Sequence, residues 1–589
     1  MKRLTIILFA TLFVFAACKK EDEEASNTTP LPPPPTVNTV TENITVNTIW
    51  TTGSIYVIDG TLNIDNATLT IQPGTTVKFK DGAQINIGYS ETGSALIANG
   101  TAASPILFTS YASTPTAGDW DGIFFENGTA STSSLQFCKF EYGGGYSSSY
   151  GTINLDDCKI SMDNCIVTNS DNYGLTVNSD AEFNSFTNNI VNNTASHLMR
   201  MYPSNVHTIG AGNVFTAINS SLGILVEGGT FDNSEETWLA QTVSYIIDGT
   251  MNVQSNSGSI LNIQEGTTIA FTGGSQINVG YTSSTYGTIK AIGTSSNPIT
   301  FTSSAVSKSA GDWDAIFLED GTSTDTKFDY CKFEYGGGYS SSYGMVNLDN
   351  CKAAFNNCTF SNNDNYGIYA DGGSSFVSFE SNTFESSSSF PIRVYGNNAH
   401  TIGVNNTYNT TLGILVEGDT YEQSSETWKK QSCGYYINGT LSIESSSGSE
   451  LIIEAGNKIY FTAGSQINIG YSSSKYGKLV AQGTGADRIL FSSSAPVGSA
   501  SAGDWDAIFF DEGTSAGSIL DNCDLSFGGG YSSSYGMVDI VNNGTNVTIS
   551  NCNFSYSESH GISVDASSAT PTLTNNTFSN ISGDDVHNN

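Results

Sequence analysis

The stretch that decides the fold is Leu69–Ile87, which reads LTIQPGTTVKFKDGAQINI. Its apolar residues form pairs two positions apart, and successive pairs begin eight residues apart: Leu69 with Ile71, Val77 with Phe79, and Ile85 with Ile87. Alternation with a period of two predicts strands, and the close spacing makes each strand very short. Glycines between the pairs allow tight corners. Three such strands make a coil of about 24 residues, so the stretch predicts one coil of a parallel β-helix.

Longer motifs repeat along the chain with a constant offset. The sequence EYGGGYSSSYG begins at Glu141 and again at Glu334, and SFGGGYSSSYG begins at Ser526. GDWDGIFF, GDWDAIFL and GDWDAIFF follow the same offset. A constant offset indicates tandem duplication, so we expect three modules of about 190 residues. We place them at residues 48–236, 237–426 and 427–589, the last one truncated because LGILVEG has only two copies.

The fold we predict is all-β: a right-handed parallel β-helix, or solenoid, of roughly twenty or more coils. Stacked repeats share one continuous core, so the modules should form one rod on the order of 100 Å long. A β-propeller would repeat every 40 to 45 residues or so, and an immunoglobulin-like sandwich would need longer strands in about 100 residues. Neither alternative matches pairs that begin eight residues apart.

The chain opens with an export signal. Two basic residues precede the apolar run Leu4–Phe15, which is too short to cross a bilayer. The residues FAAC that end at Cys18 resemble the lipobox of bacterial lipoproteins, although that family usually has Leu in place of Phe15. The resemblance implies cleavage after a signal peptide at residues 1–17 and acylation of Cys18. The alternative is a cleaved secretory signal with an incidental cysteine.

The segment after Cys18 is predicted to be a tether over residues 18–47. It starts with KKEDEE, which resembles the acidic surface-export tag of Bacteroidota lipoproteins, and it contains four consecutive prolines at positions 32–35. Polyproline is a semi-rigid spacer. We therefore expect an outer-membrane protein, held by its lipid and facing the cell exterior, with the membrane as a partner through the anchor.

Net charge restricts the other partners. The chain carries a formal charge of −35, from 56 acidic and 21 basic residues. Such a surface repels nucleic acid, which is therefore not an expected partner. No HExxH or phosphate-binding loop occurs, and noticeable polar residues come in two or three copies, so we assign no catalytic residue.

Cysteines recur in equivalent places of the modules. Three pairs are 27 or 29 residues apart, about one coil: Cys138/Cys165, Cys331/Cys358 and Cys523/Cys552. Stacked coils would bring each pair within reach of a disulfide. We favour a ladder of buried thiols, since free cysteine packs as a small apolar side chain. No CxxC or Cys/His spacing suggests zinc, and no cofactor is expected.

The GDWD motifs offer a weak calcium hypothesis. Trp120, Trp313 and Trp505 are expected to pack where a loop re-enters the coil. Calcium needs six to eight oxygen ligands, and the two carboxylates of each motif fall short of that number. The weak candidates are Asp119, Asp121, Asp312, Asp314, Asp504 and Asp506.

Tyrosine-rich loops are the candidate binding sites. Tyrosine combines a flat apolar face with a hydroxyl group, and serine and glycine add adaptable hydrogen bonding. The alternative is that these tyrosines pack on one another to close long corners. The candidates are Tyr146, Tyr150, Tyr281, Tyr286, Tyr339, Tyr343, Tyr471, Tyr476, Tyr531 and Tyr535.

From Trp50 onward the chain resembles the right-handed parallel β-helix repeat lipoproteins of Bacteroidota, on motifs such as LTIQPGTTVKF, GDWDGIFF and CKFEYGGG. The resemblance is specific for fold and implies a surface protein. We expect a non-enzymatic, adhesion-like rod that binds glycan or a partner protein through its Tyr/Ser/Gly loops. Two alternatives stay open: a β-helix polysaccharide lyase or hydrolase, and a structural spacer of the envelope.

Overall fold

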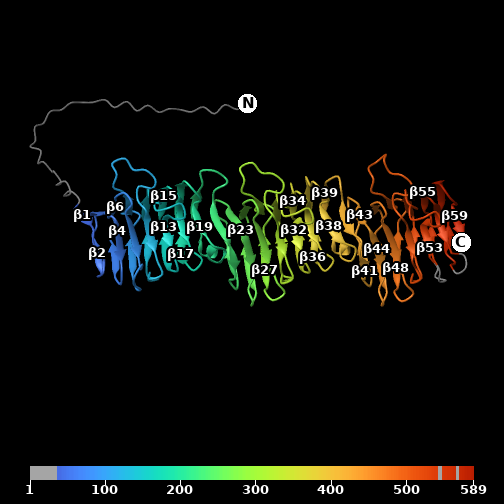
Figure 1. The fold of residues 1–589 in the computed structure, drawn as a ribbon, viewed down its shortest axis with the longest axis horizontal. Coiled ribbons are helices and arrows are strands. Elements are labelled where there is room, and N and C mark those ends of the chain that lie inside the picture. Colours follow the sequence, from blue (N-terminus) through green and yellow to red (C-terminus); the bar gives the residue numbers. More distant parts are fainter. Residues whose placement is uncertain (1–35, 542–546, 566–568, 589) are drawn as a thin grey trace, which may run out of the picture.

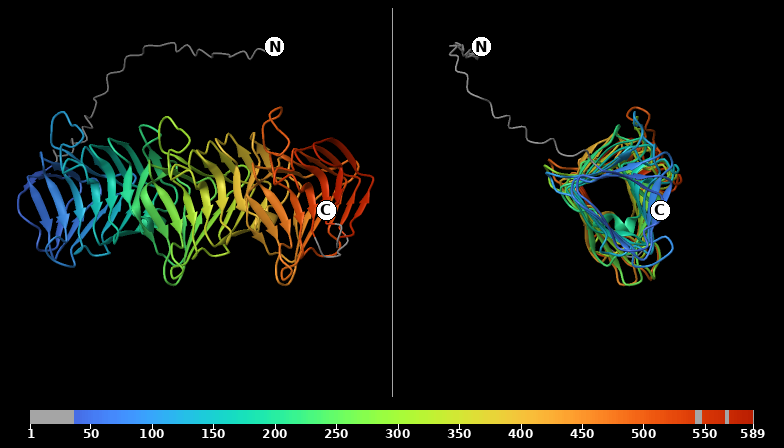
Figure 2. Two further views of the ribbon diagram at one scale, coloured as in Figure 1. Left: turned by 45° about the vertical axis from the view of Figure 1, so that its right-hand side comes forward. Right: turned by 90° about the vertical axis from the view of Figure 1, so that its left-hand side faces the viewer.

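A computed structural model describes residues 36–541, 547–565 and 569–588. The chain winds along one axis as a parallel β-solenoid of about 21 turns, from β1 at one end to β59 at the other (Figure 1). Seen along the axis, each coil is a triangle of three short strands (Figure 2). Neighbouring coils pair in parallel, as β3 does with β6 and β6 with β9. The predicted fold class is confirmed.

The strands fall on three faces, which we number in the order in which a coil visits them. The first face consists of β1 (Val37–Val40), β3 (Ile55–Ile58), β6 (Thr76–Phe79), β9 (Ile106–Ser110), β12 (Cys138–Glu141), β15 (Ile166–Ser170), β18 (Ile190–Thr194), β20 (Val214–Thr216), β25 (Thr268–Phe271), β28 (Ile299–Ser303), β31 (Cys331–Glu334), β34 (Thr359–Ser361), β37 (Thr383–Glu385), β39 (Thr407–Asn409), β43 (Tyr435–Asn438), β46 (Lys458–Phe461), β49 (Ile489–Ser493), β52 (Cys523–Ser526), β55 (Asn553–Ser557) and β58 (Thr577–Ile581).

The second face consists of β4 (Thr61–Ile64), β7 (Gln84–Ile87), β10 (Gly122–Phe125), β13 (Gly151–Leu155), β16 (Tyr173–Val177), β19 (Met199–Met201), β26 (Gln276–Val279), β29 (Ile316–Leu318), β32 (Gly344–Leu348), β35 (Tyr366–Ala370), β38 (Ile392–Tyr395), β40 (Ile414–Glu417), β41 (Thr420–Tyr421), β44 (Thr440–Ile443), β47 (Gln466–Ile469), β50 (Ile508–Phe510), β53 (Gly536–Ile540), β56 (His560–Val564) and β59 (Val586–Asn588).

The third face consists of β2 (Thr48–Trp50), β5 (Thr68–Ile71), β8 (Ala95–Asn99), β11 (Ser134–Gln136), β14 (Lys159–Asp163), β17 (Glu182–Thr187), β22 (Glu236–Trp238), β24 (Ser259–Ile263), β27 (Gly287–Ile292), β30 (Lys327–Asp329), β33 (Lys352–Asn356), β36 (Ser375–Glu380), β42 (Glu426–Trp428), β45 (Ser449–Ile453), β48 (Gly477–Gln482), β51 (Ile519–Asp521), β54 (Thr548–Ser550) and β57 (Thr572–Thr574). Two short 3-10 helices, η1 (Pro203–Thr208) and η2 (Ala399–Thr401), follow the second face near the ends of modules one and two.

Two long strands, β21 (Ile224–Phe231) and β23 (Tyr245–Val253), join the first two modules. The column β16–β19–β21 on the second face continues through the first half of β23 into β25, which lies on the first face of module two. A column of stacked strands therefore changes face at the junction. Because stacked strands also twist, equivalent long loops of the three modules still project on the same side of the rod (Figures 1 and 2).

One apolar core runs through the rod. The alternating residues of the deciding stretch, such as Leu69, Ile71, Val77 and Phe79, all point inward and are buried. Like side chains stack from coil to coil, as in the parallel rings of Phe333 and Phe360, whose centroids lie 4.9 Å apart. The nine described cysteines are free thiols, and eight of them are buried. Cys138 and Cys165 stack as expected, with the Cys138 N–H donating to Cys165 Sγ at 3.4 Å.

The rod begins before the boundary at residue 48 that the sequence suggested. Strand β1 pairs in parallel with β3, and Ile44 is buried and bridges to Ile64. The predicted signal peptide, Cys18 and the proline run lie outside the described residues. Among the residues that the structure describes, no helix is long and apolar enough to span a membrane.

Candidate functional site

The base of each tyrosine loop is fixed by the tryptophan of the GDWD motif. Trp313 is fully buried and stacks on Phe271 at 4.3 Å between centroids, while its Nε1–H donates to the carbonyl of Glu334 at 2.8 Å. A side chain at Gly336 would place its Cβ 2.6 Å from the Trp313 ring. The glycine run after Glu334 is therefore required by the tryptophan beneath it. Trp120 and Trp505 make the same contacts, which confirms the expected packing.

Above that base, two tyrosines cover one outward-facing phenylalanine. In module two, Phe317 lies 5.1 Å from Tyr339 and 5.7 Å from Tyr343, edge to face, and the two tyrosines lie 5.5 Å apart. Phe317 is buried, whereas Tyr339 and Tyr343 remain 52% and 37% exposed. The same three-ring cluster occurs as Phe124/Tyr146/Tyr150 and as Phe509/Tyr531/Tyr535. The rings therefore pack together, as the alternative hypothesis expected, and they still present open faces, so ligand binding by these tyrosines stays a prediction.

Polar side chains form the floor beside each ring cluster. The QIN motif places Ile277 inward and leaves Gln276 and Asn278 outward on the second face. Gln276 donates to Asn278 at 2.8 Å, and Asn278 donates to Asn252 on the coil below at 3.1 Å. Asn347, on the coil above Phe317, is bonded to the backbone of Gly344. These amides are held in fixed orientations and present hydrogen-bonding groups to the space above them.

A groove of about 670 Å³ lies over this floor in module two. The tyrosine loop with Tyr339 and Tyr343 lines it together with Tyr281, which comes from the opposite corner of the coil and is 58% exposed. Module one has a smaller groove of about 260 Å³ in the same place, lined by Tyr89, Tyr146 and Tyr150. Small-molecule sites have volumes of roughly 300–1,000 Å³, so the groove of module two can hold a few sugar residues.

Not every candidate tyrosine faces this groove. Tyr286 lines a different hollow with Ser257 and Asp320, toward the third face. Its backbone is tied to Ser255 by an antiparallel bridge, and Tyr476 is tied to Ser445 in the same way. The structure therefore brings Tyr281, Tyr339 and Tyr343 together in module two and leaves Tyr286 outside the groove.

Carboxyl groups line one wall of the groove. Glu319, Asp349 and Asp371 follow three successive strands of the second face, β29, β32 and β35. Burial and the neighbouring charges of Asp349 and Asp320 raise the pKa of Glu319 to about 7. In module three, burial and the charge of Asp539 raise the pKa of Asp511 to about 7. The groove of module two therefore carries a carboxyl group, that of Glu319, which is partly protonated at neutral pH.

Two arginines hold the tyrosine loops from above. Arg393 pairs with Glu417 at 2.9 Å, and its Nη1 donates to the carbonyl of Ser342 at 2.8 Å. Its guanidinium also lies over the rings of Tyr366 and Tyr369. Arg200 makes the same ion pair in module one and donates to the carbonyl of Ser149 at 3.2 Å. These arginines position the loops, and each is paired with a glutamate.

The weak calcium candidates serve a different purpose. Asp312 accepts hydrogen bonds from the Ser303 hydroxyl at 2.6 Å and from the Ser309 N–H at 2.9 Å, which closes its own loop. Burial opposes the charge of Asp119, yet hydrogen bonds from Ser110 and Thr116 lower its pKa. Asp121, Asp314 and Asp506 have raised pKa values because they are partly buried. Within the described ranges, these carboxylates do not assemble into a cluster of three ligands.

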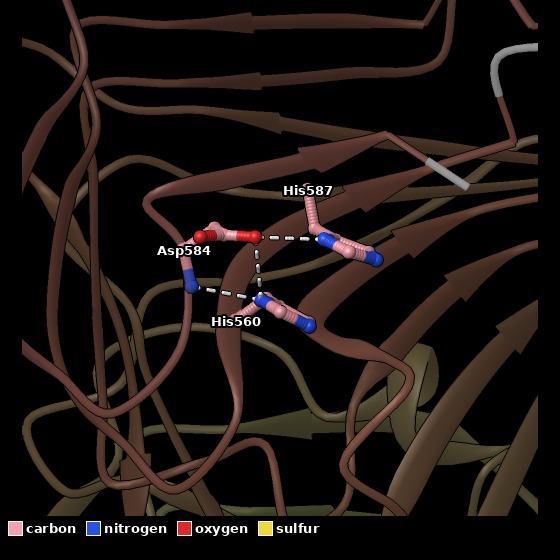
Figure 3. Close-up of side chains that lie close together, drawn as sticks. All are labelled: His560, Asp584 and His587. Atoms are coloured by element: carbon pink, nitrogen blue, oxygen red, sulfur yellow. Dashed lines mark hydrogen bonds and ion pairs between the residues drawn. The ribbon is translucent and has the colours of Figure 1, made fainter.

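One cluster that the sequence analysis missed lies at the last described coil. His560, Asp584 and His587 come together, with both imidazole Nδ1 atoms directed at one carboxylate oxygen (Figure 3). The spacing of 24 and 27 residues is about one coil, and that spacing was the signal available in the sequence.

Phe124, Phe317 and Phe509 were also missed by the sequence analysis. In the GDWDGIFF motif, Ile123 and Phe125 point inward, and side chains alternate along a strand, so the ring of Phe124 must point outward. An outward apolar ring needs other side chains to cover it.

Comparisons with known proteins agree with this architecture. Residues 41–206 and 229–346 match the family described as "Pectate-lyase like beta helix domain", which covers most of module one and the first part of module two. No curated protein matches the chain significantly. One similar solved structure, described as a mannuronic acid specific polysaccharide family 6 lyase from human gut microbiota, has 12% identity, covers 77% of this chain and 81% of its own, and gives a TM-score of 0.17. A TM-score that low carries no argument about this chain.

Proposed function

We propose that this chain is a lipid-anchored protein of the outer cell surface that binds glycan chains along its second face, without cleaving them. The observation that carries the proposal is the ring cluster Phe317/Tyr339/Tyr343, which recurs in the same geometry in all three modules and in module two lies beside a floor of fixed amides. Aromatic faces stack on the apolar faces of sugar rings, while amides bond to hydroxyl groups. A groove of this composition suits a carbohydrate.

Repetition supports binding of a long ligand. Equivalent loops project on the same side of the rod, so one extended polymer can lie across more than one groove (Figure 2). Each groove then needs only weak affinity, because linked sites gain effective concentration and together bind far more tightly than one. A protein surface is the second kind of partner that such tyrosine and serine loops suit.

Charge narrows the class of glycan. The groove of module two is lined by Glu319, Asp349 and Asp371, and the whole chain has a formal net charge of −35. Negative carboxylates repel uronate or sulfate groups, and the described arginines beside the loops are already paired. The preferred ligand is therefore an uncharged polysaccharide, whose vicinal hydroxyls can donate to these carboxylates.

One observation favours a catalytic alternative. Burial raises the pKa of Glu319 to about 7 and also raises the pKa of the neighbouring Asp349, and glycoside hydrolysis uses a pair of carboxyl groups of which one is held protonated. A second candidate function is therefore polysaccharide cleavage at this pair. The third possibility, a spacer of the envelope, requires no groove at all.

Affinity electrophoresis of the soluble chain in gels that contain neutral or acidic polysaccharides tests the proposal. The double variant Tyr339→Ala/Tyr343→Ala should lose most of the retardation by a neutral polysaccharide, and Tyr286→Ala, outside the groove, is the matched control. Equal retardation of all three proteins would reject the groove. Incubation of the same polysaccharides with wild type and Glu319→Gln, followed by measurement of reducing ends and unsaturated products, decides between binding and cleavage.

A further inference from the structure

The terminal cluster of histidines differs from its counterparts in modules one and two. His560 pairs with Gly536, and Tyr366 pairs with Gly344. Gly536 and Gly344 are the same residue of the GYSSSYG motif, so His560 occupies in module three the position of Tyr366 in module two. His587 pairs with Ser563, and Arg393 pairs with Tyr369. Ser563 and Tyr369 each lie three residues after the aligned pair, so His587 occupies the position of Arg393. Where module two places a guanidinium over tyrosine rings, module three places two imidazoles and a carboxylate. Imidazole and carboxylate together are the ligand set preferred by first-row divalent transition ions.

The donor atoms already converge. Asp584 Oδ2 lies 2.8 Å from His587 Nδ1 and 3.7 Å from His560 Nδ1, and all three donor atoms lie within 4.8 Å of one another. The two imidazoles are stacked, with centroids 3.9 Å apart, so their nitrogens point the same way (Figure 3). Ligands about 2.0–2.1 Å from a tetrahedral ion lie roughly 3.4 Å apart, a separation that the two measured distances bracket.

The backbone holds this arrangement in place. Gly561 N–H donates to the carbonyl of Asp584 at 3.0 Å, and Gly583 N–H donates to that of Ser559 at 2.9 Å, which fixes the turn that carries the carboxylate. The Asp584 N–H donates to His560 Nδ1 at 2.8 Å. That hydrogen bond occupies the lone pair of His560 Nδ1, so an entering cation must displace the N–H to bind this nitrogen.

From this geometry we propose that His560, Asp584 and His587 form a binding site for a divalent transition ion of the zinc type. The Asp584 and His587 side chains are 64% and 32% exposed, so the ion can enter from solvent and keep an open position for water. Calcium does not fit, because it requires mainly oxygen ligands. The site is separate from the calcium candidates of the GDWD motifs and does not depend on glycan binding.

The bound ion has a structural consequence for the third tyrosine loop. It links β56 to the coil of β59, and the backbone of His560 contacts the loop through its N–H, which donates to the Tyr535 carbonyl. In module two, Arg393 ties the equivalent loop by its bond to Ser342. The His560 ring also hydrogen-bonds to the Ser533 backbone of that loop, so an ion that fixes His560 adds to a positioning comparable to that of the guanidinium in module two.

Isothermal titration of the full, tag-free chain with Zn²⁺ tests the site, and Co²⁺ absorption in the visible range reports the ligand geometry. We expect one ion per chain and a rise in the melting temperature. Loss of an outer-shell partner costs about 10–100-fold in metal affinity, so His587→Ala and Asp584→Asn should each weaken binding at least that much. His207→Gln, outside the cluster, is the matched control and should bind as wild type does.

Two results would overturn the assignment. One is the absence of Zn²⁺ binding to the wild-type chain, and the other is equal affinity in wild type, His587→Ala and Asp584→Asn. Circular dichroism of each variant shows that the coil is still folded. Because Asp584→Asn keeps the size and shape of the side chain, it separates loss of a ligand from loss of structure.

Discussion

Arg393 Nη1 donates to the main-chain carbonyl of Ser342 at 2.8 Å, across 51 residues of sequence. The bond joins the second face of module two to the middle of its GYSSSYG loop. Arg200 and Ser149 repeat it in module one, at the same separation in sequence. The tyrosine loop is therefore clamped from two sides, by a buried tryptophan below and by an arginine above, and its rings are held ready before any ligand arrives.

The first prediction concerns this clamp. Arg393→Lys keeps the charge but cannot bond to Glu417 and Ser342 together, so we expect a loss of about 1 kcal/mol in local stability. Amide hydrogen exchange over residues 340–344 should become about fivefold faster. Arg488→Lys, which alters an arginine far from the loop, is the control. Unchanged exchange in the Arg393 variant would show that the loop holds itself.

The second prediction concerns the phenylalanine beneath the tyrosines. Phe317→Leu stays apolar but loses two edge-to-face contacts, worth about 0.5–1.5 kcal/mol each, so Tyr339 and Tyr343 should lose their fixed orientation. Retention of the chain by a neutral polysaccharide should fall several-fold. Phe360→Leu, in the interior stack, should lower the melting temperature without that effect. If both variants behave alike, the cluster has no special role in binding.

The third prediction concerns pH. The folded chain holds the Glu319 proton more tightly than the unfolded chain, because its pKa is raised from 4.5 to about 7. Its contribution to stability is therefore present below the unfolded pKa and is lost as pH rises through about 7. Glu319→Gln should raise the melting temperature at pH 8 but not at pH 4.5, by an amount equivalent to about 1 kcal/mol after allowance for solvent screening.

The control for that prediction is Glu265→Gln, an exposed carboxylate outside the groove. It corrects for the general effect of removing one negative charge from a chain whose formal net charge is −35. Scanning calorimetry of the three proteins at both pH values gives the comparison. A gain that is equal at pH 4.5 and pH 8 would contradict the assignment of the raised pKa to Glu319.

The fourth prediction concerns the glycine run. Gly336→Ala would place a methyl group 2.6 Å from the Trp313 ring, which is packed too tightly to move away. We expect a destabilisation of about 1–3 kcal/mol, as for overpacking of a core, measured as a lower midpoint in urea. Gly485→Ala is the matched control, since nothing lies within 4 Å of its Cβ position. Equal midpoints would mean that the loop can rearrange around the tryptophan.

The fifth prediction concerns the thiol ladder. Cys331 and Cys358 are buried free thiols, and the Cys358 sulfur donates to the main-chain carbonyl of Asn356 at 3.2 Å. A reducing agent should therefore leave the melting temperature unchanged. Cys358→Ser places a more polar group in the core and should cost about 1–3 kcal/mol. A fall in melting temperature on reduction of the wild type would show that disulfides form instead.

Much of the architecture follows from the sequence. The eight-residue spacing of Leu69/Ile71, Val77/Phe79 and Ile85/Ile87 determines strands, corners and coil length, because side chains alternate faces along a strand. The constant offset of the motifs gives the modules. The packing of Trp313 where a loop re-enters the coil could also be predicted from the repeated GDWD motif. These features are local or periodic, and one sequence is enough to reveal them.

The site depended on tertiary structure. Which corner each loop leaves, and therefore that Tyr281 joins Tyr339 while Tyr286 does not, is set by the path of the chain between coils. The pairing of Arg393 with Ser342, and the meeting of His560 with His587, join residues one or two coils apart. A repeat fixes how many residues make a coil, but only the stacking of coils, with its twist and its change of face at the module junction, decides which side chains meet.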